Sequence, residues 1–148
     1  KVIIDPKGSD YSMYEGAFLI KPNEHEFQIV AGNTNNKRDM IARGKQLKKK
    51  LNINALLLTL GKSGMILFDE SQTISFPTLQ KDVYDVTGAG DSVLAAMAVG
   101  ISCDQSTMIT SAIAAFMASM SVEQMGNTPI NEKALVKKIQ EFFNVQNF

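Results

Sequence analysis

The sequence has very few of the residues that stabilise small disulfide-rich domains or zinc sites. Its 148 residues include one cysteine, Cys103, and one histidine, His25. One cysteine excludes an internal disulfide framework, and one cysteine with one histidine is too few for a zinc site of the usual Cys/His type. The 15 Lys and Arg residues are balanced by 15 Asp and Glu residues. Because nucleic-acid-binding modules carry a basic excess, this balance argues against a nucleic-acid partner.

Long hydrophobic runs are absent as well. The longest wholly apolar stretch covers residues 93–101, far short of the ~20 residues that span a bilayer. The first residues do not resemble a signal peptide, so we expect a cytoplasmic protein that binds no membrane. The chain starts at Lys1 without an initiator methionine, inside a segment that reads as a strand. We therefore interpret it as a piece of a longer protein.

The segments that remain alternate between strand and helix. Apolar, mostly continuous runs predict strands at residues 2–4, 17–20, 55–60, 65–68 and 73–76, with a further extended segment at 82–87. Helical spacing and caps predict helices at residues 23–32, 36–51, 88–101, 105–123 and 131–143. Continuous apolar strands are typical of parallel sheets buried on both faces. The sequence therefore predicts one α/β sandwich with a mostly parallel sheet, in which residues 65–76 form a hairpin.

The strongest chemical signal lies at residues 85–91, which read Asp-Val-Thr-Gly-Ala-Gly-Asp and precede a helix of small residues. Gly88, Ala89 and Gly90 leave the first backbone N–H groups of that helix unshielded, and the helix dipole adds positive potential there, so the segment suits a phosphate. Asp91 could accept a proton from a hydroxyl nucleophile while the N–H groups neutralise the phosphoryl group. The alternative is a tight turn followed by an acid that favours the helix dipole.

Two lysines follow predicted strands, where open α/β sheets place their ligands. Lys21 ends the second strand and could pair with phosphate oxygens, or it is simply the first solvated residue after that strand. Lys7 is similar: a phosphate or sugar-phosphate contact and an ordinary surface loop are both open. Asn23 can cap the following helix, with Glu26 at its third position as in a capping box.

The run Gly61-Lys62-Ser63 imitates the end of a P-loop but is not one. A P-loop needs a glycine five residues before Gly61, where Leu56 stands, and the segment leads into a strand rather than a helix. The turn between Gly61 and Gly64 therefore reads as an ordinary strand connection unless another observation gives it a role.

Four segments in the same order resemble the ribokinase-like (PfkB) carbohydrate kinases. They are the Asp-Pro-Lys-Gly loop at residues 5–8, the Asn-x-x-Glu motif at 23–26, the Thr-x-Gly-x-x-Gly turn at 59–64, and the Asp-Val-Thr-Gly-Ala-Gly-Asp signature at 85–91. The combination of residues 5–8, 22–27 and 83–91 is most similar to bacterial D-glycero-β-D-manno-heptose 7-phosphate kinases. The resemblance runs over essentially the whole chain.

This resemblance implies a ribokinase-like α/β/α fold, ATP and Mg²⁺ as cofactors, and a role for each matching residue. Asp91 would be the catalytic base, and Gly88, Ala89 and Gly90 would form the anion hole. Asn23 and Glu26 would organise Mg²⁺ through water. The remaining nucleotide contacts would come from Lys21, Thr59, Gly61, Gly64 and Thr87. Residues 115–127 would lie beside the adenine, although Ala115 stands where many relatives carry an asparagine.

The resemblance also defines what this chain lacks. Kinases of the family are about twice as long, and their N-terminal half carries a Gly-Gly sugar-binding motif and a β-sheet lid. We therefore expect residues 1–148 to be the C-terminal, nucleotide-side part of one kinase domain, inactive in isolation. The expected reaction is transfer of the γ-phosphoryl group of ATP to heptose 7-phosphate, giving heptose 1,7-bisphosphate for ADP-heptose and lipopolysaccharide core synthesis. A kinase for another sugar or a nucleoside, a non-catalytic nucleotide-binding module, and a homodimer all remain open.

Overall fold

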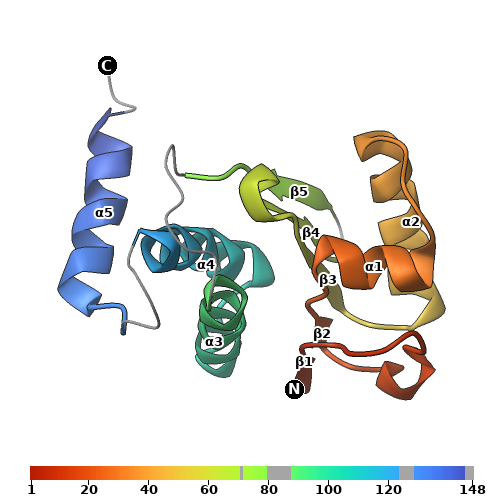
Figure 1. Ribbon diagram of the computed structural model, residues 1–148. Helices are drawn as coiled ribbons and strands as arrows, with labels where there is room; N and C mark the ends of the chain where they lie inside the picture. Colours follow the sequence, from red (N-terminus) through yellow and green to blue (C-terminus); the bar gives the residue numbers. More distant parts are fainter. Residues whose placement is uncertain (71, 80–87, 124–128, 146–148) are drawn as a thin grey trace.

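The computed structural model describes residues 1–70, 72–79, 88–123 and 129–145 (Figure 1). In this part of the chain one sheet has the strand order β1-β2-β3-β4-β5. Its strands are β1 (Ile3–Ile4), β2 (Leu19–Ile20), β3 (Ala55–Thr59), β4 (Met65–Phe68) and β5 (Thr73–Phe76). The first two pairings are parallel and the last two antiparallel, so β4 alone among these strands opposes the others. The mostly parallel sheet and the hairpin are confirmed.

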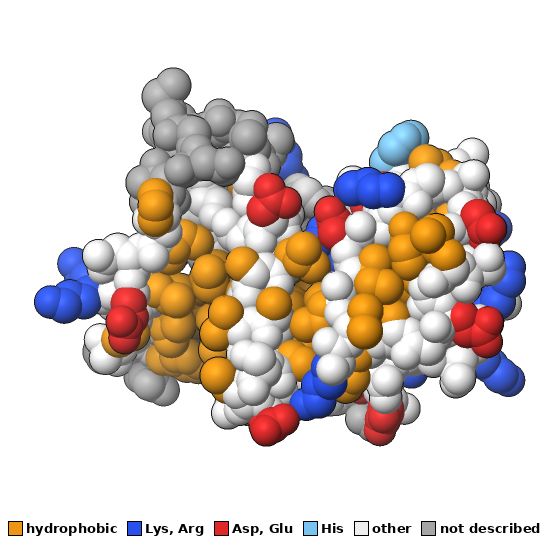
Figure 2. All heavy atoms as spheres, turned by 90° about the horizontal axis from the view of Figure 1, so that it is seen from below, with side chains coloured by type: hydrophobic (Ala, Val, Ile, Leu, Met, Phe, Trp, Pro, Cys, Tyr) orange, Lys and Arg blue, Asp and Glu red, His pale blue; other side chains and the backbone are white. Residues whose placement is uncertain are grey.

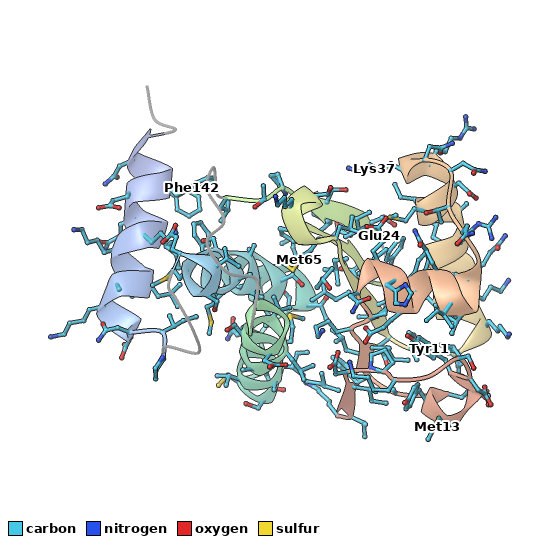
Figure 3. All side chains as sticks on the ribbon, in the orientation of Figure 1. Tyr11, Met13, Glu24, Lys37, Met65 and Phe142 are labelled. Atoms are coloured by element: carbon cyan, nitrogen blue, oxygen red, sulfur yellow. The ribbon has the colours of Figure 1, made fainter. Side chains whose placement is uncertain are left out.

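Helices cover both faces of the sheet, as Figure 1 shows. One face carries α1 (Glu24–Ala31) and α2 (Lys37–Lys50), and the other carries α3 (Ala89–Ser102) and α4 (Thr107–Val122). The last helix, α5 (Glu132–Val145), packs on the outer side of α4. Its Phe142 ring meets the Phe116 ring of α4 edge to face, and Figure 3 shows Phe142 projecting from α5. Two short 3₁₀ turns lie at Ser12–Tyr14 and Gly61–Ser63.

The central position of strand β3 explains why its sequence is continuously apolar. Leu56 and Leu58 point into the core beneath α1 and α2, whereas Ala55 and Leu57 point into the core beneath α3 and α4. All four side chains are fully buried. A central strand with a hydrophobic core on each face has no solvent side, and the alternation typical of half-exposed strands is therefore lost.

Local side-chain caps set the starts of the helices on the first face. Asn23 caps α1 in a complete capping box with Glu26, and the Asn36 side chain accepts a hydrogen bond of 2.9 Å from the backbone of Asp39 at the start of α2. Both starts agree with the sequence prediction. The extended segment predicted at 82–87 and the turn residue Ser71 lie outside the described residues.

Helices α3 and α4 lie close together because small residues meet at their interface. A Cβ atom added at Gly100 would stand 2.5 Å from the side chain of Thr110, so glycine is what allows this approach. Figure 2 shows hydrophobic side chains gathered on the face of the molecule that it draws. The exposed hydrophobic residues of α3 and α4 include Val99 and Ile109. Over the described residues, none of the helices combines the length and apolarity that a membrane span requires.

Candidate active site

A cleft of about 830 Å³ opens where β1, β2 and β3 end and α3 begins. Ligands of open α/β sheets bind outside the carboxyl ends of the strands, so the position itself suits a binding site. Nearly all the described residues that the sequence nominated line this cleft; they are Lys7, Lys21, Asn23, Glu26, Thr59, Gly61, Gly64, Ala89, Gly90 and Asp91. Gly88 caps α3 just outside the lining, and Thr87 lies outside the described residues.

The start of α3 has the features of an anion site. Gly88 adopts the left-handed conformation, with φ of 80°, and caps the helix without a side chain. The first N–H groups of α3 are those of Ala89 and Gly90. A methyl group and a hydrogen atom are the only substituents there, so the backbone is open to a ligand. Asp91 in the same turn is exposed, and among the described residues its carboxylate makes no hydrogen bond or ion pair. Its two oxygen atoms are therefore open to a hydrogen-bond donor.

Lys21 is buried rather than solvated, which rules out one of the two interpretations left open by the sequence. Its side chain is only 5% exposed, and its Nζ atom lies 2.9 Å from Oδ1 of Asp5. This contact joins two charges without the angles of a hydrogen bond, and Oδ1 has no hydrogen-bond donor among the described residues. A Cβ atom built on Gly90 would lie 3.6 Å from the same ammonium group. The buried positive charge therefore stands beside the open start of α3.

A chain of alternating charges continues from Lys21 across the cleft. Asp5 also pairs with Lys7 at 3.1 Å, and Lys7 pairs with Glu26 at 2.7 Å. Burial alone would raise the pKa of Asp5, but the ammonium groups of Lys21 and Lys7 outweigh it and hold that pKa below its usual value. The hydrogen bond to Glu26 and the contact with Asp5 raise the pKa of Lys7. Asp5 and Lys7 are thus held in their charged forms around neutral pH.

Asp5 is the one cleft residue in this network that sequence reasoning did not nominate. It appeared there only as part of a turn signal and of the matching loop at residues 5–8. A carboxylate directly after a strand, followed by a lysine two residues later, was the available signal. What the sequence could not show is that Lys21, at the end of the neighbouring strand, is the second partner of Asp5.

Asn23 and Glu26 form the capping box, and their oxygen atoms could still accept hydrogen bonds from the waters of a metal ion. The Asn23 side chain accepts the Glu26 N–H at 2.8 Å, while Glu26 Oε2 accepts the Asn23 N–H at 2.8 Å and Oε1 accepts from Lys7. Each carboxylate oxygen accepts one hydrogen bond among the described residues, which leaves its second lone pair available. Mg²⁺ retains several waters in proteins, and a carboxylate that accepts hydrogen bonds from such waters fits it. Among the described residues no group of three metal-ligating side chains is preformed.

The turn at Gly61 and Gly64 has a structural requirement of its own. Thr59 ends β3 beside Asn23, to which it is joined by a parallel bridge, and the chain then makes the 3₁₀ turn into β4. Gly64 has φ of 86°, and a Cβ atom there would stand 2.0 Å from the backbone oxygen of Phe76. The hairpin therefore requires this glycine whether or not a nucleotide lies beside it.

The opposite wall of the cleft comes from α4. Its contributions are small or apolar side chains, namely Ala115, Ala118, Ser119 and Val122. Small and apolar side chains suit an aromatic base, which the resemblance places along residues 115–127. Residues 124–128 of that stretch lie outside the described part of the chain. Figure 2 shows a hollow in the upper outline of the face that it draws, with charged side chains on both of its sides.

Comparison with known proteins identifies relatives of this chain. A model of the family described as "pfkB family carbohydrate kinase" matches residues 1–134. The Bifunctional protein HldE of Shewanella piezotolerans is 36% identical over 142 residues, which are 95% of this chain and 30% of that protein. The chain therefore spans about a third of the length of the curated relatives that it matches.

Solved structures agree with the sequence comparison. Arabidopsis thaliana ribokinase, complexed with ribose and ATP, superposes with a TM-score of 0.81 at 27% identity, over 92% of this chain and 46% of that one. Escherichia coli phosphofructokinase-2, in complex with potassium, gives 0.82 at 19% identity, over 91% and 45%. These superpositions show a shared fold, and they confirm the ribokinase-like α/β/α architecture expected from the sequence.

Proposed function

The chain belongs to the pfkB family of carbohydrate kinases, and from this membership we propose that the protein transfers the γ-phosphoryl group of ATP to a hydroxyl group of a sugar. One observation carries the proposal. A single cleft brings together the open start of α3, the buried ammonium group of Lys21 and the Asn23–Glu26 pair. Positive potential for a phosphate, a carboxylate base and oxygen atoms for a hydrated cation are the parts that phosphoryl transfer requires.

Asp91 is the proposed catalytic base. Its carboxylate takes the proton of the sugar hydroxyl while the new O–P bond forms and the bond between the β,γ-bridging oxygen and the γ-phosphorus breaks, which releases ADP. The N–H groups at the start of α3 and the Lys21 ammonium group stabilise the negative charge on the transferred phosphoryl oxygens. Glu26 and Asn23 would hold Mg²⁺ through its waters, and the cation would neutralise phosphate charge when it is bound.

The proposed substrate is heptose 7-phosphate, phosphorylated at its anomeric hydroxyl. The support is the combined resemblance of residues 5–8, 22–27 and 83–91 to the heptose 7-phosphate kinases, together with 36% identity to a protein named HldE. Lys7 gives no evidence for the sugar, because its ammonium group already forms ion pairs with Glu26 and Asp5. Turnover of the complete protein with heptose 7-phosphate, ribose, fructose 6-phosphate and a nucleoside would identify the sugar.

The extent of the chain belongs to the same proposal. We take it as the nucleotide-side part of a kinase domain, since its solved relatives are about twice as long. The outer edge of β1 has no strand partner among the described residues, and Val99 on the neighbouring helix is 65% exposed. An unpaired edge beside exposed apolar residues suits a surface that further strands would cover. Such a part would bind nucleotide without turning over sugar.

Asp91→Asn in the complete protein tests the proposed chemistry. The amide fills the same space and leaves the start of α3 unchanged, but it cannot accept the hydroxyl proton. Loss of a general base typically costs about 10²–10⁴-fold in rate, so kcat should fall by that factor while Mg²⁺-ATP still raises the melting temperature. A variant that melts normally and retains near-wild-type kcat would overturn the proposal and leave a nucleotide-binding module as the alternative.

A further inference from the structure

The first turn of α3 is joined to the last turn of α4 by two serine side chains. The Ser92 and Ser121 hydroxyl oxygens lie 2.6 Å apart, and this distance lies within the normal range for an O–H···O hydrogen bond. Ser92 directly follows Asp91, and Ser121 is a buried residue at the end of α4. The bond therefore links the helix that carries the proposed base to the helix that forms the opposite wall of the cleft.

The direction of this hydrogen bond follows from the other contacts of the two serines. Ser121 donates its single hydroxyl proton to the backbone oxygen of Met117 at 3.1 Å. The proton between the two serines must then come from Ser92, so the chain runs from Ser92 to Ser121 to Met117. The backbone N–H of Ser92 also donates to the Gly88 oxygen at 2.9 Å. The first turn of α3 is thus held both along its own axis and across to α4.

The two helices have a second close contact at their other ends, where Gly100 meets Thr110. That contact and the buried side chains between the helices set the distance between them. The serine bond adds a polar contact at the end of α3 that carries Asp91. A fixed first turn holds the carboxylate at one distance from the phosphate and from the attacking hydroxyl.

We infer that Ser92 and Ser121 are positioning residues that hold Asp91 in place for proton transfer. This inference rests on the proposed function, since it assigns a task to Asp91. The serines do not touch the reacting atoms, and their effect should therefore appear in kcat and not in nucleotide affinity. Ser92→Ala and Ser121→Ala in the complete protein should each lower kcat about 10-fold, less than the ~10²-fold that a 1 Å misplacement can cost.

The chain offers a matched control at the same helix interface. Ser111 is a fully buried serine of α4 whose hydroxyl contacts the Met97 sulfur of α3 at 3.6 Å, closer to the Gly100 end. Ser111→Ala should lower the melting temperature as much as Ser121→Ala, but it should leave kcat unchanged. Ser92→Thr keeps a hydroxyl at a half-buried site and should recover most of the rate that Ser92→Ala loses. The affinity for Mg²⁺-ATP, measured by calorimetry, should change less than twofold in every variant.

Two results would overturn the inference. One is a kcat for Ser92→Ala and Ser121→Ala that equals that of Ser111→Ala; the other is a loss of rate that Ser92→Thr does not recover. If Ser121→Ala fails to fold, the half-buried Ser92 pair of variants decides alone. Asp91→Asn, assayed in parallel, separates the two ideas. A fall in its kcat with unchanged serine variants refutes only the positioning role, whereas an unchanged Asp91→Asn refutes the proposed function itself.

Discussion

Lys21 and Asp5 form a buried ion pair, and we predict that removing one charge destabilises the fold more than removing the other. Lys21→Met keeps the apolar stem and removes the ammonium group. Asp5 then still has Lys7 at 3.1 Å, so its charge stays compensated. Asp5→Asn leaves the Lys21 ammonium group, 5% exposed, without a carboxylate among the described residues. An uncompensated buried charge is the costly outcome, whereas removal of the charge itself is tolerated.

The magnitudes follow from the same contacts. Breaking a fully buried pair costs about 3–5 kcal/mol, and because the Asp5 side chain is 27% exposed we expect about 2–3 kcal/mol for Asp5→Asn. Lys21→Met should cost less, about 1–2 kcal/mol, because Asp5 keeps Lys7 on its Oδ2 atom while its buried Oδ1 atom loses the ammonium group. Nucleotide binding should show the reverse order. A hydrogen bond to a charged group contributes about 1.5–3 kcal/mol, so Lys21→Met should weaken binding of Mg²⁺-ATP by at least about 10-fold.

Urea unfolding at pH 7 and calorimetric titration with Mg²⁺-ATP, both on the complete protein, measure these two quantities. Lys62→Met, a lysine on the rim of the same cleft in an exposed turn, is the matched control for the loss of one positive charge. Equal destabilisation by Asp5→Asn and Lys21→Met would show that the pair is not buried as described. Unchanged nucleotide affinity in Lys21→Met would show that its ammonium group faces no phosphate.

Two further predictions concern stability. The pKa of Asp5 is lowered in the folded protein, so its charge contributes stability that is complete above the unfolded-state pKa near 3.8 and is lost as the pH falls through the lower folded-state pKa. Asp5→Asn should therefore flatten the pH dependence of urea unfolding below pH ~4. An unaltered pH dependence would contradict this. Gly64→Ala should cost about 2–4 kcal/mol, because it combines a positive φ with a clash against the Phe76 oxygen. Gly61→Ala, with φ of 53° and nothing within 4 Å of the new methyl group, should cost only about 1 kcal/mol, and thermal melts that show equal losses would refute the distinction.

The local features of this fold could be read from neighbouring residues. Asn23 and Glu26 lie three residues apart, which is the spacing of a capping box, and the box is present. The continuous apolar run of β3 predicted a strand buried on both sides, and the strand has a hydrophobic core on each face. In each case the interactions that decide the structure join residues within one turn or one strand, so the sequence contains them directly.

The site required more than local pattern. The sequence by itself determined the type of each chemical group: a glycine-rich helix start with an acid, a capping pair, and lysines after strands. Only the tertiary structure decided that Lys21 is buried against Asp5, that Lys7 pairs with Glu26 and that Gly64 meets the Phe76 backbone. The two ion pairs exist because parallel strand order brings the ends of β1 and β2 to one edge of the sheet, and the Gly64 contact exists because β4 and β5 pair antiparallel. Proximity of that kind depends on how the strands pair, and a residue's neighbours in sequence do not encode it.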